Sequence, residues 1–328
     1  MKRLEKIAVI GGGAFGSALS CIAARAGNDT MLFLRDEAVR DTINQSHTNP
    51  ARLGEITLPN SIVATTNPDD LASAEIVLFA VPAQQTRGVA AQLERAFPAA
   101  RKIIASAKGL ESESGRFQHQ LLSAAFPDKQ VLALSGPSFA KDIAQKLPTA
   151  LTIAAEDMAS AERAAKILSS PSFRLYSSDD RVGVETGGAL KNVLAIAVGA
   201  VRGMGLGASA EAALIARGFA ELKRLGMAMG AKEETLSGLS GLGDLVLTCS
   251  SPQSRNFSCG LALGRGDPLS GIPLAEGVHT AGIAAEIARR HHIEAPVIAT
   301  VAAVLEQKLS PKEAVDVLLA RPLKSETG

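Results

Sequence analysis

Three glycines near the start of the chain have the spacing of a diphosphate-binding turn. Gly11, Gly13 and Gly16 follow the apolar run 7–10 and open an Ala-rich segment, 14–26, whose pattern predicts a helix. A strand, a glycine turn and a helix are the context in which GxGxxG binds a dinucleotide. Gly11 permits the tight turn, Gly13 lets the pyrophosphate approach the backbone, and Gly16 lets the helix pack on the strand. We therefore expect the phosphates to lie at the positive end of this helix.

Two lysines have the setting for acid–base chemistry. Lys108 lies in SAKGLE just after a predicted strand, and Lys191 interrupts an apolar helical segment together with Asn192. A lysine buried beside other charges has a lowered pKa and serves as a general acid or base. Alternatively, Lys108 is a surface loop residue and Lys191 extends its ammonium to water. A lysine base is preferred to a His–Asp pair because all the histidines fall in polar or terminal contexts. They are His47, His119, His279, His291 and His292.

Polar residues between 244 and 256 suggest a carboxylate and a phosphate clamp. Asp244 and Thr248 are four residues apart and share a face if the segment is helical, although Asp244 could instead cap that helix. Ser254, Arg255 and Asn256 follow, and an arginine near a helix start can bind phosphate oxygens in a bidentate manner. The alternative is an ordinary turn with an exposed arginine.

Two further segments follow predicted strands. In SGPSFA, residues 135–140, Ser138 has the type of a helix N-cap and Gly136 precedes it. At the end of the second strand Arg35 occupies the place where an arginine suits the 2′-phosphate of NADPH, and Asp36 follows it. Arg35 favours NADP(H), whereas Asp36 could serve NAD(H) by a small change in loop path. A solvated turn is the third interpretation of this pair.

The elements that must position these residues change character near residue 180. Apolar runs predict strands at 30–34, 76–81, 102–106, 131–135, 150–154 and 173–177. Helical patterns lie between several of them, at 84–97, 115–126 and 158–169. This alternation predicts an α/β fold with a doubly wound, Rossmann-type, mostly parallel sheet of more than six strands. After residue 180 the spacing is helical, with segments at 188–204, 208–229, 277–290 and 295–306. We expect a dinucleotide-binding domain at 1–180 and an all-α substrate-binding and catalytic domain at 181–328.

Composition narrows the class of protein. The 328 residues are 46% hydrophobic and carry a formal net charge of +1, so no overall field favours nucleic acid or an anionic membrane. The three cysteines, Cys21, Cys249 and Cys259, form no CxxC pair and no metal-ligand spacing, which fits a reducing compartment. The apolar run 193–201 is too short to span a bilayer. We expect a cytoplasmic protein without a metal, a membrane span or a nucleic-acid partner.

The motifs together resemble the bacterial NAD(P)-dependent glycerol-3-phosphate dehydrogenases. The matching stretches occur in the family's order and read GGGAFGSALS, AVP, SAKGLE, SGPSFA, LKNVLAIA, SGLGDLVLTC and SRN. Among these, KGLE, SGPSFA and GLGDLVLTC with SRN are far more specific than the glycine fingerprint. The resemblance implies an oxidoreductase that interconverts glycerol 3-phosphate and dihydroxyacetone phosphate with NADP(H) or NAD(H). It also implies a homodimer that supplies phospholipid synthesis.

The resemblance also assigns roles to residues. Lys191 looks like the proton acceptor for the C2 hydroxyl, with Lys108 and Asp244 beside it. The implied substrate residues are Lys108, Gly136, Ser138, Lys191, Asn192, Asp244, Thr248, Ser254, Arg255 and Asn256. The implied cofactor residues are Gly11, Gly13, Ala14, Phe15, Gly16, Arg35, Lys108, Ala140, Arg255, Leu274 and Glu276.

The chain departs from the family pattern in places. Phe15 stands where relatives carry Trp or Tyr, the residues after Asn256 are not basic, and the segment 264–273 is shortened. Two other functions share parts of the pattern. A ketopantoate- or hydroxyacid-type dehydrogenase would use Arg255 for a carboxylate. A non-catalytic NADPH-binding sensor would bind the cofactor without turnover.

Overall fold

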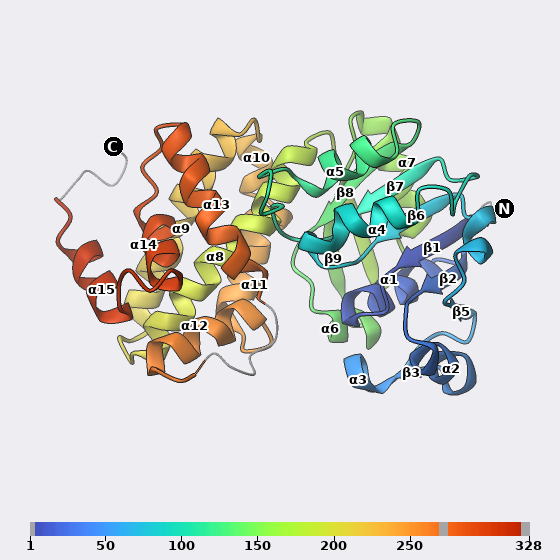
Figure 1. Ribbon diagram of the computed structural model, residues 1–328, viewed down its shortest axis with the longest axis horizontal. Helices are drawn as coiled ribbons and strands as arrows, with labels where there is room; N and C mark the ends of the chain where they lie inside the picture. The colour runs from blue at the N-terminus through green and yellow to red at the C-terminus, as the bar shows by residue number, and fades with distance from the viewer. Residues whose placement is uncertain (1–3, 269–274, 323–328) are drawn as a thin grey trace.

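The computed structural model describes residues 4–268 and 275–322. A sheet with helices on both faces forms one half of the molecule, and a cluster of helices forms the other (Figure 1). The main sheet has eight strands in the order β10-β9-β8-β7-β6-β1-β2-β5. Their bounds are β1 Lys6–Ile10, β2 Asp29–Phe33, β5 Ile62–Thr65, β6 Ile76–Phe79, β7 Lys102–Ala105, β8 Gln130–Ser135, β9 Thr149–Ala154 and β10 Phe173–Ser178.

The sheet is mostly parallel, as predicted. Only the β8–β9 pairing is antiparallel, so β9 and β10 run opposite to the other six strands. The edge strand β5 and a small antiparallel pair, β3 Thr48–Asn49 with β4 Gly54–Thr57, were not predicted from the sequence. Strands of two to four residues are too short to show a clear alternation of apolar and polar residues.

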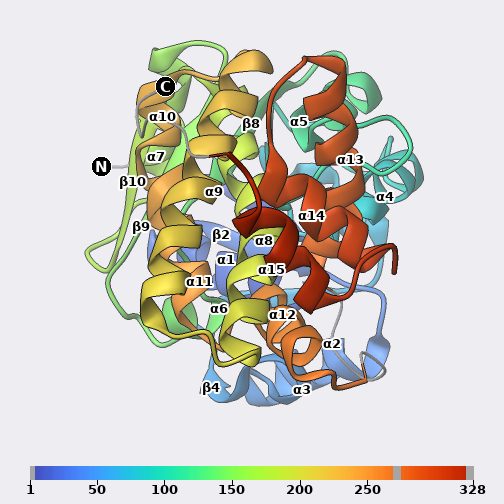
Figure 2. The same ribbon diagram turned by 90° about the vertical axis from the view of Figure 1, so that its left-hand side faces the viewer.

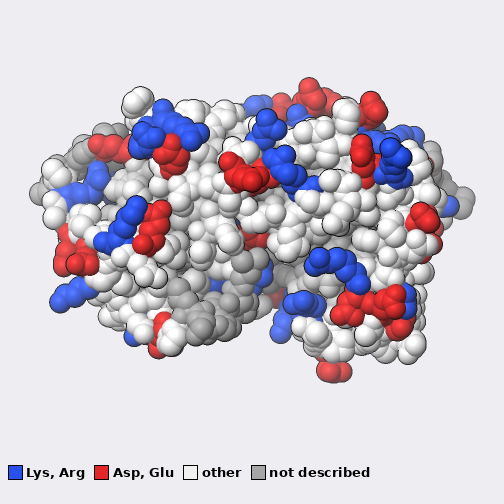
Figure 3. Space-filling view, viewed as in Figure 1, with Lys and Arg blue, Asp and Glu red and all other residues white. Residues whose placement is uncertain are grey.

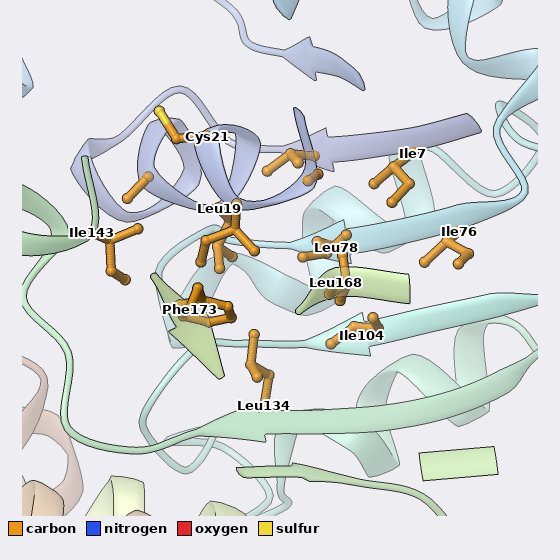
Figure 4. Packing of buried hydrophobic residues seen from close by; sticks show 14 of the residues in the cluster. Ile7, Leu19, Cys21, Ile76, Leu78, Ile104, Leu134, Ile143, Leu168 and Phe173 are labelled. Atoms are coloured by element: carbon orange, nitrogen blue, oxygen red, sulfur yellow. The ribbon is translucent and has the colours of Figure 1, made fainter. Parts of the chain in front are cut away.

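Both faces of the sheet are buried, which explains why its strands read as continuous apolar runs. In β1, Ile7 and Val9 pack on one face while Ala8 and Ile10 pack on the other. Figure 4 shows the first of these faces, where residues of helices α1 and α6 meet the strands. The helices of this half are α1 Ala14–Arg25, α2 Glu37–Ser46, α3 Pro50–Leu53, α4 Thr86–Gln92, α5 Gln118–Ala125, α6 Ala140–Ala144 and α7 Met158–Leu168.

The loops that follow the parallel strands lie together at one edge of the sheet. β1, β2, β6, β7 and β8 run in the same direction, so their carboxyl ends lie together. These ends lead respectively into the glycine turn, Arg35, the segment 80–83, the Lys108 loop and Gly136. The fold therefore collects at one edge the segments that sequence reasoning selected.

Every regular element described after β10 is helical. The bounds are α8 Arg181–Gly203, α9 Ala208–Ala228, α10 Glu233–Leu236, a short π-helical turn Leu239–Gly243, α11 Asp244–Ser250, α12 Arg255–Arg265, α13 Glu276–Arg290, α14 Pro296–Leu305 and α15 Pro311–Leu319. Helix α8 lies in the middle of this half, with α9, α12 and α13 packed around it (Figure 2). It is long and apolar enough to cross a membrane, but 89% of its apolar window is buried inside the protein, as in a core helix.

Helices α8 and α12 approach each other closely because glycines line the contact. A Cβ on Gly199 would overlap the carbonyl oxygen of Phe257, and one on Gly260 would overlap that of Ile196. Gly203 and Gly264 repeat this arrangement one turn further on. The close packing brings the start of α12 beside the middle of α8.

Several predicted boundaries were wrong. Helix α8 begins at Arg181 rather than 188, because the Asp180 carboxylate accepts the Gly183 N–H (2.7 Å) and caps it. The predicted helix 84–97 is a 3₁₀ turn, Ala83–Gln85, followed by the shorter α4. The division of the chain into domains at 180 and 181 stays a prediction.

Candidate active site

The glycine turn after β1 has the shape that a dinucleotide requires. Gly11 has a φ of +121°, and a Cβ there would lie 2.7 Å from the Ala80 carbonyl oxygen. A Cβ on Gly16 would overlap the Gly11 carbonyl oxygen, so these two glycines are required by the fold itself. A Cβ on Gly13, by contrast, would meet no protein atom within 4 Å. The open side of Gly13 leaves room for a phosphate at the N-terminus of α1, whose first turn holds no acidic residue.

Asp36 and Arg35, the two residues that could select between NADH and NADPH, differ in their contacts. Asp36 is the N-cap of α2, and its carboxylate accepts the N–H groups of Ala38 (3.0 Å) and Val39 (3.2 Å). Arg35 is exposed at the end of β2. One oxygen of the carboxylate, Oδ1, is thus engaged by the helix, while Arg35 is exposed.

The two lysines meet at one carboxylate. Asp244 is fully buried, and its Oδ2 accepts Lys108 Nζ while its Oδ1 accepts Lys191 Nζ, each at 2.7 Å. Lys191 Nζ also donates to Thr248 Oγ1 at 2.6 Å. Burial lowers the pKa of Lys191 to about 8; the Asp244 carboxylate opposes this shift and the Lys108 ammonium adds to it. A lysine with this pKa changes protonation state near neutral pH, as a general acid or base must.

Helices α8 and α11 place the members of this cluster. Asp244 is the first residue of α11 and Thr248 lies one turn later, so the two share a face as the spacing predicts. The Thr248 hydroxyl donates to the Asp244 carbonyl oxygen (2.6 Å), which leaves its oxygen to accept from Lys191. The alternative of Asp244 as a helix cap is wrong, because its two carboxylate oxygens are taken by the lysines and α11 has no side-chain cap.

The loop after β8 anchors Lys108 from the opposite side. Lys108 Nζ donates to the Gly136 carbonyl oxygen at 2.8 Å, and Ser138 Oγ donates to the same oxygen at 3.1 Å. Ser138 is therefore not the N-cap that its sequence suggests; α6 begins at Ala140 after Phe139 and has no side-chain cap. The Lys108 ammonium lies 5.9 Å from the Phe15 ring centroid, so it also faces the first turn of α1.

Two asparagines link the lysines to the start of α13. Asn192 Nδ2 donates to the Lys108 carbonyl oxygen (3.0 Å), and Asn192 Oδ1 accepts from Asn256 Nδ2 (2.8 Å). Asn256 Oδ1 in turn accepts the Gly277 N–H (2.8 Å). These bonds join the loop after β7 to α8, α12 and α13.

The remaining predicted residues lie around this cluster or outside it. Ser254 caps α12 by accepting the Phe257 N–H (3.2 Å), and the exposed Arg255 begins that helix. Glu276, at the start of α13, accepts the Ala83 N–H (3.2 Å); burial raises its pKa, and Arg255 nearby opposes that rise. Ala14 and Ala140 are the first residues of α1 and α6. Leu274 lies outside the described residues.

Sequence reasoning missed the residues that hold the Lys108 loop. Gln118 Nε2 donates to the Gly109 carbonyl oxygen (2.9 Å), and Gln84 Nε2 donates to that of Leu110 (2.8 Å). Sequence reasoning also missed the partner of His119. This histidine is buried in α5, and its ring and its backbone N–H both contact the Glu185 carboxylate on α8. No spacing rule reveals a pair 66 residues apart.

Two further observations concern the charges on the surface and the side chains that could bind a metal ion. Figure 3 shows both signs of charge mingled over one face and a hollow at its lower edge between the two halves. Among residues 4–268 and 275–322, no group of three or more His, Cys, Asp or Glu side chains is placed to hold a metal ion.

Comparisons with known proteins agree over nearly the whole chain. The family described as the NAD-dependent glycerol-3-phosphate dehydrogenase N-terminus matches residues 6–161, and the corresponding C-terminus matches residues 180–316. The chain is 54% identical over 322 residues to a glycerol-3-phosphate dehydrogenase [NAD(P)+] of Brucella ovis, covering 98% of this chain and 99% of that one. A protein of the same name from a Chelativorans species is 51% identical over 330 residues. The match covers 99% of this chain and 100% of that one.

Solved structures give the same result. A glycerol-3-phosphate dehydrogenase from Coxiella burnetii superposes with a TM-score of 0.91 at 34% identity, covering 97% of this chain and 99% of that one. A ketopantoate reductase from Ralstonia eutropha reaches a TM-score of 0.59 at 18% identity over 94% of this chain and 99% of its own. The second likeness shows a shared fold only.

Proposed function

The chain belongs to the NAD-dependent glycerol-3-phosphate dehydrogenase family, and on this premise we propose that it reversibly reduces dihydroxyacetone phosphate to sn-glycerol 3-phosphate. The observation that carries the proposal is the buried Asp244 carboxylate that holds Lys108 and Lys191 at 2.7 Å each, at the sheet edge where the glycine turn also lies. A sensor that only binds a dinucleotide needs no such cluster.

We assign the proton-transfer role to Lys191. In the oxidation, neutral Lys191 Nζ takes the proton of the substrate's C2 hydroxyl as the C2–H bond breaks. In the reduction, the ammonium returns that proton to the oxygen of the C2 carbonyl. The nicotinamide ring, when bound, accepts or supplies the hydride. Asp244 Oδ1 and Thr248 Oγ1 take two of the three hydrogen-bond directions of Lys191 Nζ, which leaves the third for the substrate oxygen.

The cations around Lys191 suit an anionic substrate. Lys108 stays beside Asp244 and Gly136, where its ammonium stabilises negative charge that develops on the carbonyl oxygen. Arg255, exposed at the start of α12, can present a guanidinium to the substrate phosphate. We assign the remaining phosphate and pocket contacts to neighbouring polar groups, namely Gly136, Ser138, Asn192, Thr248, Ser254 and Asn256.

We propose that the cofactor lies along the glycine turn. Gly11, Gly13, Ala14, Phe15 and Gly16 surround its diphosphate. Glu276 contacts the cofactor from the helical half; its bond to the Ala83 N–H, just after β6, supports this assignment. We keep Ala140 and Leu274 as expected cofactor contacts from the family resemblance.

We further propose that NADPH is preferred to NADH. Asp36 would bind the adenosine ribose hydroxyls of NADH, and one of its carboxylate oxygens, Oδ1, already accepts two N–H groups of α2. The exposed Arg35 guanidinium matches the charge of a 2′-phosphate.

The proposal has three further parts, which concern the domains, the localisation and the assembly of the chain. Residues 1–180 bind the dinucleotide, and residues 181–328 supply Lys191, Asp244 and the phosphate clamp. The chain acts in the cytoplasm, as its three buried free cysteines suggest, and provides glycerol 3-phosphate for phospholipid synthesis. It assembles as a homodimer, which sedimentation equilibrium would test.

A spectrophotometric assay tests the activity. Purified protein is mixed with dihydroxyacetone phosphate, and the loss of absorbance of NADPH or NADH is followed in parallel. Unphosphorylated dihydroxyacetone and ketopantoate serve as substrate controls. We expect rapid oxidation only with the phosphorylated ketone, and faster oxidation of NADPH. Binding of NADPH without turnover of any ketone would instead support the sensor, and turnover of ketopantoate the hydroxyacid-type enzyme.

A further inference from the structure

A short excursion of the chain brings a buried asparagine to the glycine turn. Between α2 and β5 the chain leaves the main sheet and forms the pair β3–β4, with α3 between the two strands. Leu53 and Leu58 of this excursion are buried in the core of the main sheet, so the excursion packs against that core. Asn49, the last residue of β3, is only 1% exposed.

The side-chain amide of Asn49 bonds to two atoms of the dinucleotide-binding segment. Its Nδ2 donates to the Gly12 carbonyl oxygen at 3.1 Å and to Ser17 Oγ, in the first turns of α1, at 2.9 Å. The Leu34 side chain also lies close to Gly12, with its Cβ 2.7 Å from where a Cβ on Gly12 would be. Gly12 is thus held by a hydrogen bond and by close packing.

The remaining atom of this amide argues against a purely packing role. Asn49 Oδ1 is buried and has no hydrogen-bond partner among the described residues. A buried acceptor without a donor destabilises a fold, and an apolar residue at this position would avoid that cost. The donor group on Nδ2 is therefore the feature of Asn49 that requires explanation.

We propose that Asn49 is a positioning residue for the bound dinucleotide, acting through the Gly12–Gly13 peptide; this inference rests on the proposed function. A trans peptide is planar, so its C=O and N–H point in opposite directions. Fixing the Gly12 carbonyl oxygen on Asn49 therefore fixes the Gly13 N–H on the side away from Asn49. Since Gly13 also has open space where a side chain would be, Asn49 holds this N–H ready for a phosphate oxygen before the cofactor arrives.

The test compares two substitutions at Asn49. Asn49→Ala removes the donor, and Asn49→Asp keeps the shape while placing a carboxylate against the Gly12 carbonyl oxygen. NADPH binding is titrated through the fluorescence of the nicotinamide. Both substitutions are expected to raise the Kd of NADPH about tenfold, Asp at least as much as Ala. With saturating NADPH, kcat and the KM for dihydroxyacetone phosphate stay within about twofold of the wild type, because the lysine cluster is untouched.

Asn44 provides a matched control in the preceding helix. Its side chain also makes two hydrogen bonds, in this case both to backbone atoms, the N–H (2.8 Å) and the carbonyl oxygen (2.9 Å) of Ala64, and none to the glycine turn. Asn44→Ala is expected to leave the Kd of NADPH unchanged, even if it lowers the melting temperature. If Asn49→Ala fails to fold, Asn49→Leu, an apolar side chain of similar size that also lacks the donor, carries the test.

The outcomes separate this inference from the proposed function. Wild-type protein that binds no NADPH overturns the proposed function. Wild-type protein that binds NADPH, together with Asn49 variants whose Kd is unchanged, overturns the role of Asn49. A fall in kcat equal to the rise in Kd would also overturn it, because the effect would then be a general loosening of the fold.

Discussion

The glycine turn and the lysine cluster lie at the same edge of the sheet but are built in different ways. The turn uses backbone groups from six consecutive residues, Gly11 to Gly16, and carries no charged side chain. The cluster uses charged side chains from three segments, and 136 residues separate Lys108 from Asp244. A contiguous backbone site is readable from spacing, whereas a site of dispersed side chains exists only after folding.

The two regions also differ in what they contribute to stability. The glycines of the turn permit close packing that the fold needs. Buried ion pairs contribute little net stability, because desolvation offsets their attraction. The shared Asp244 carboxylate is therefore better explained by its effect on the lysines than by stability. We expect substitutions in the cluster to lower turnover and substitutions in the turn to weaken cofactor binding.

The largest expected effect is that of Lys191→Met, which removes the proton donor while keeping most of the side-chain volume. We expect kcat to fall by about 10²- to 10⁴-fold, the range that general acid–base groups contribute, with the Kd of NADPH unchanged. Steady-state kinetics and a binding titration measure the two quantities. Lys232→Met is the control, since Lys232 makes an equally short ion pair (2.7 Å, with Asp179) on the exposed surface. Turnover near the wild-type value in the Lys191 variant would remove it from proton transfer.

Two glycine substitutions test the glycine turn in the way that the Lys191 variant tests the lysine cluster. Gly13→Ala adds a methyl group where no protein atom lies within 4 Å, so the melting temperature should hold while the Kd of NADPH rises about 10- to 100-fold. Gly16→Ala overlaps the Gly11 carbonyl oxygen, so it should lower both the melting temperature and the affinity. Unchanged NADPH affinity in the Gly13 variant would show that the phosphates lie elsewhere.

Arg255→Ala tests whether the helical half binds the phosphate of the substrate. Loss of a hydrogen bond to a charged group should raise the KM for dihydroxyacetone phosphate about tenfold or more, with a smaller change in kcat. Initial rates over a range of ketone concentrations measure both. An unaltered KM would exclude Arg255 from the phosphate clamp.

The smallest expected effect is that of Arg35→Ala on cofactor choice. Arg35 is exposed, so solvent screens its attraction for a 2′-phosphate, and we expect kcat/KM for NADPH to fall about tenfold or less. The value for NADH should change little. Equal losses with the two cofactors would contradict a 2′-phosphate contact.

The sequence predicted the parts of the fold that depend on local pattern. The strand at 7–10, the glycine turn and the helix after it follow one another in the chain, and periodicity and spacing were sufficient. β5 and the β3–β4 pair were missed because strands of two to four residues are too short to show a clear alternation of apolar and polar residues. The start of α8 was placed seven residues too late because the polar and glycine-rich residues before 188 obscure the helical pattern.

The chemistry of the candidate site was predicted more completely than its geometry. Residue types and family motifs selected Lys108, Lys191 and Asp244, but only the fold shows that both lysines share one carboxylate. The supporting contacts of Gln84, Gln118 and Asn49 could not be predicted, because each joins a side chain to the backbone of a separate segment.

The pH dependence of kcat in both reaction directions tests the central claim, that Lys191 transfers the proton, most directly. Lys191 must carry a proton to reduce the ketone and must be neutral to oxidise the alcohol. Because its pKa is lowered to about 8, kcat for reduction should fall as the pH rises through about 8, and kcat for oxidation should rise over the same interval. Profiles that are flat in both directions, or that move in the same direction, would contradict the assignment.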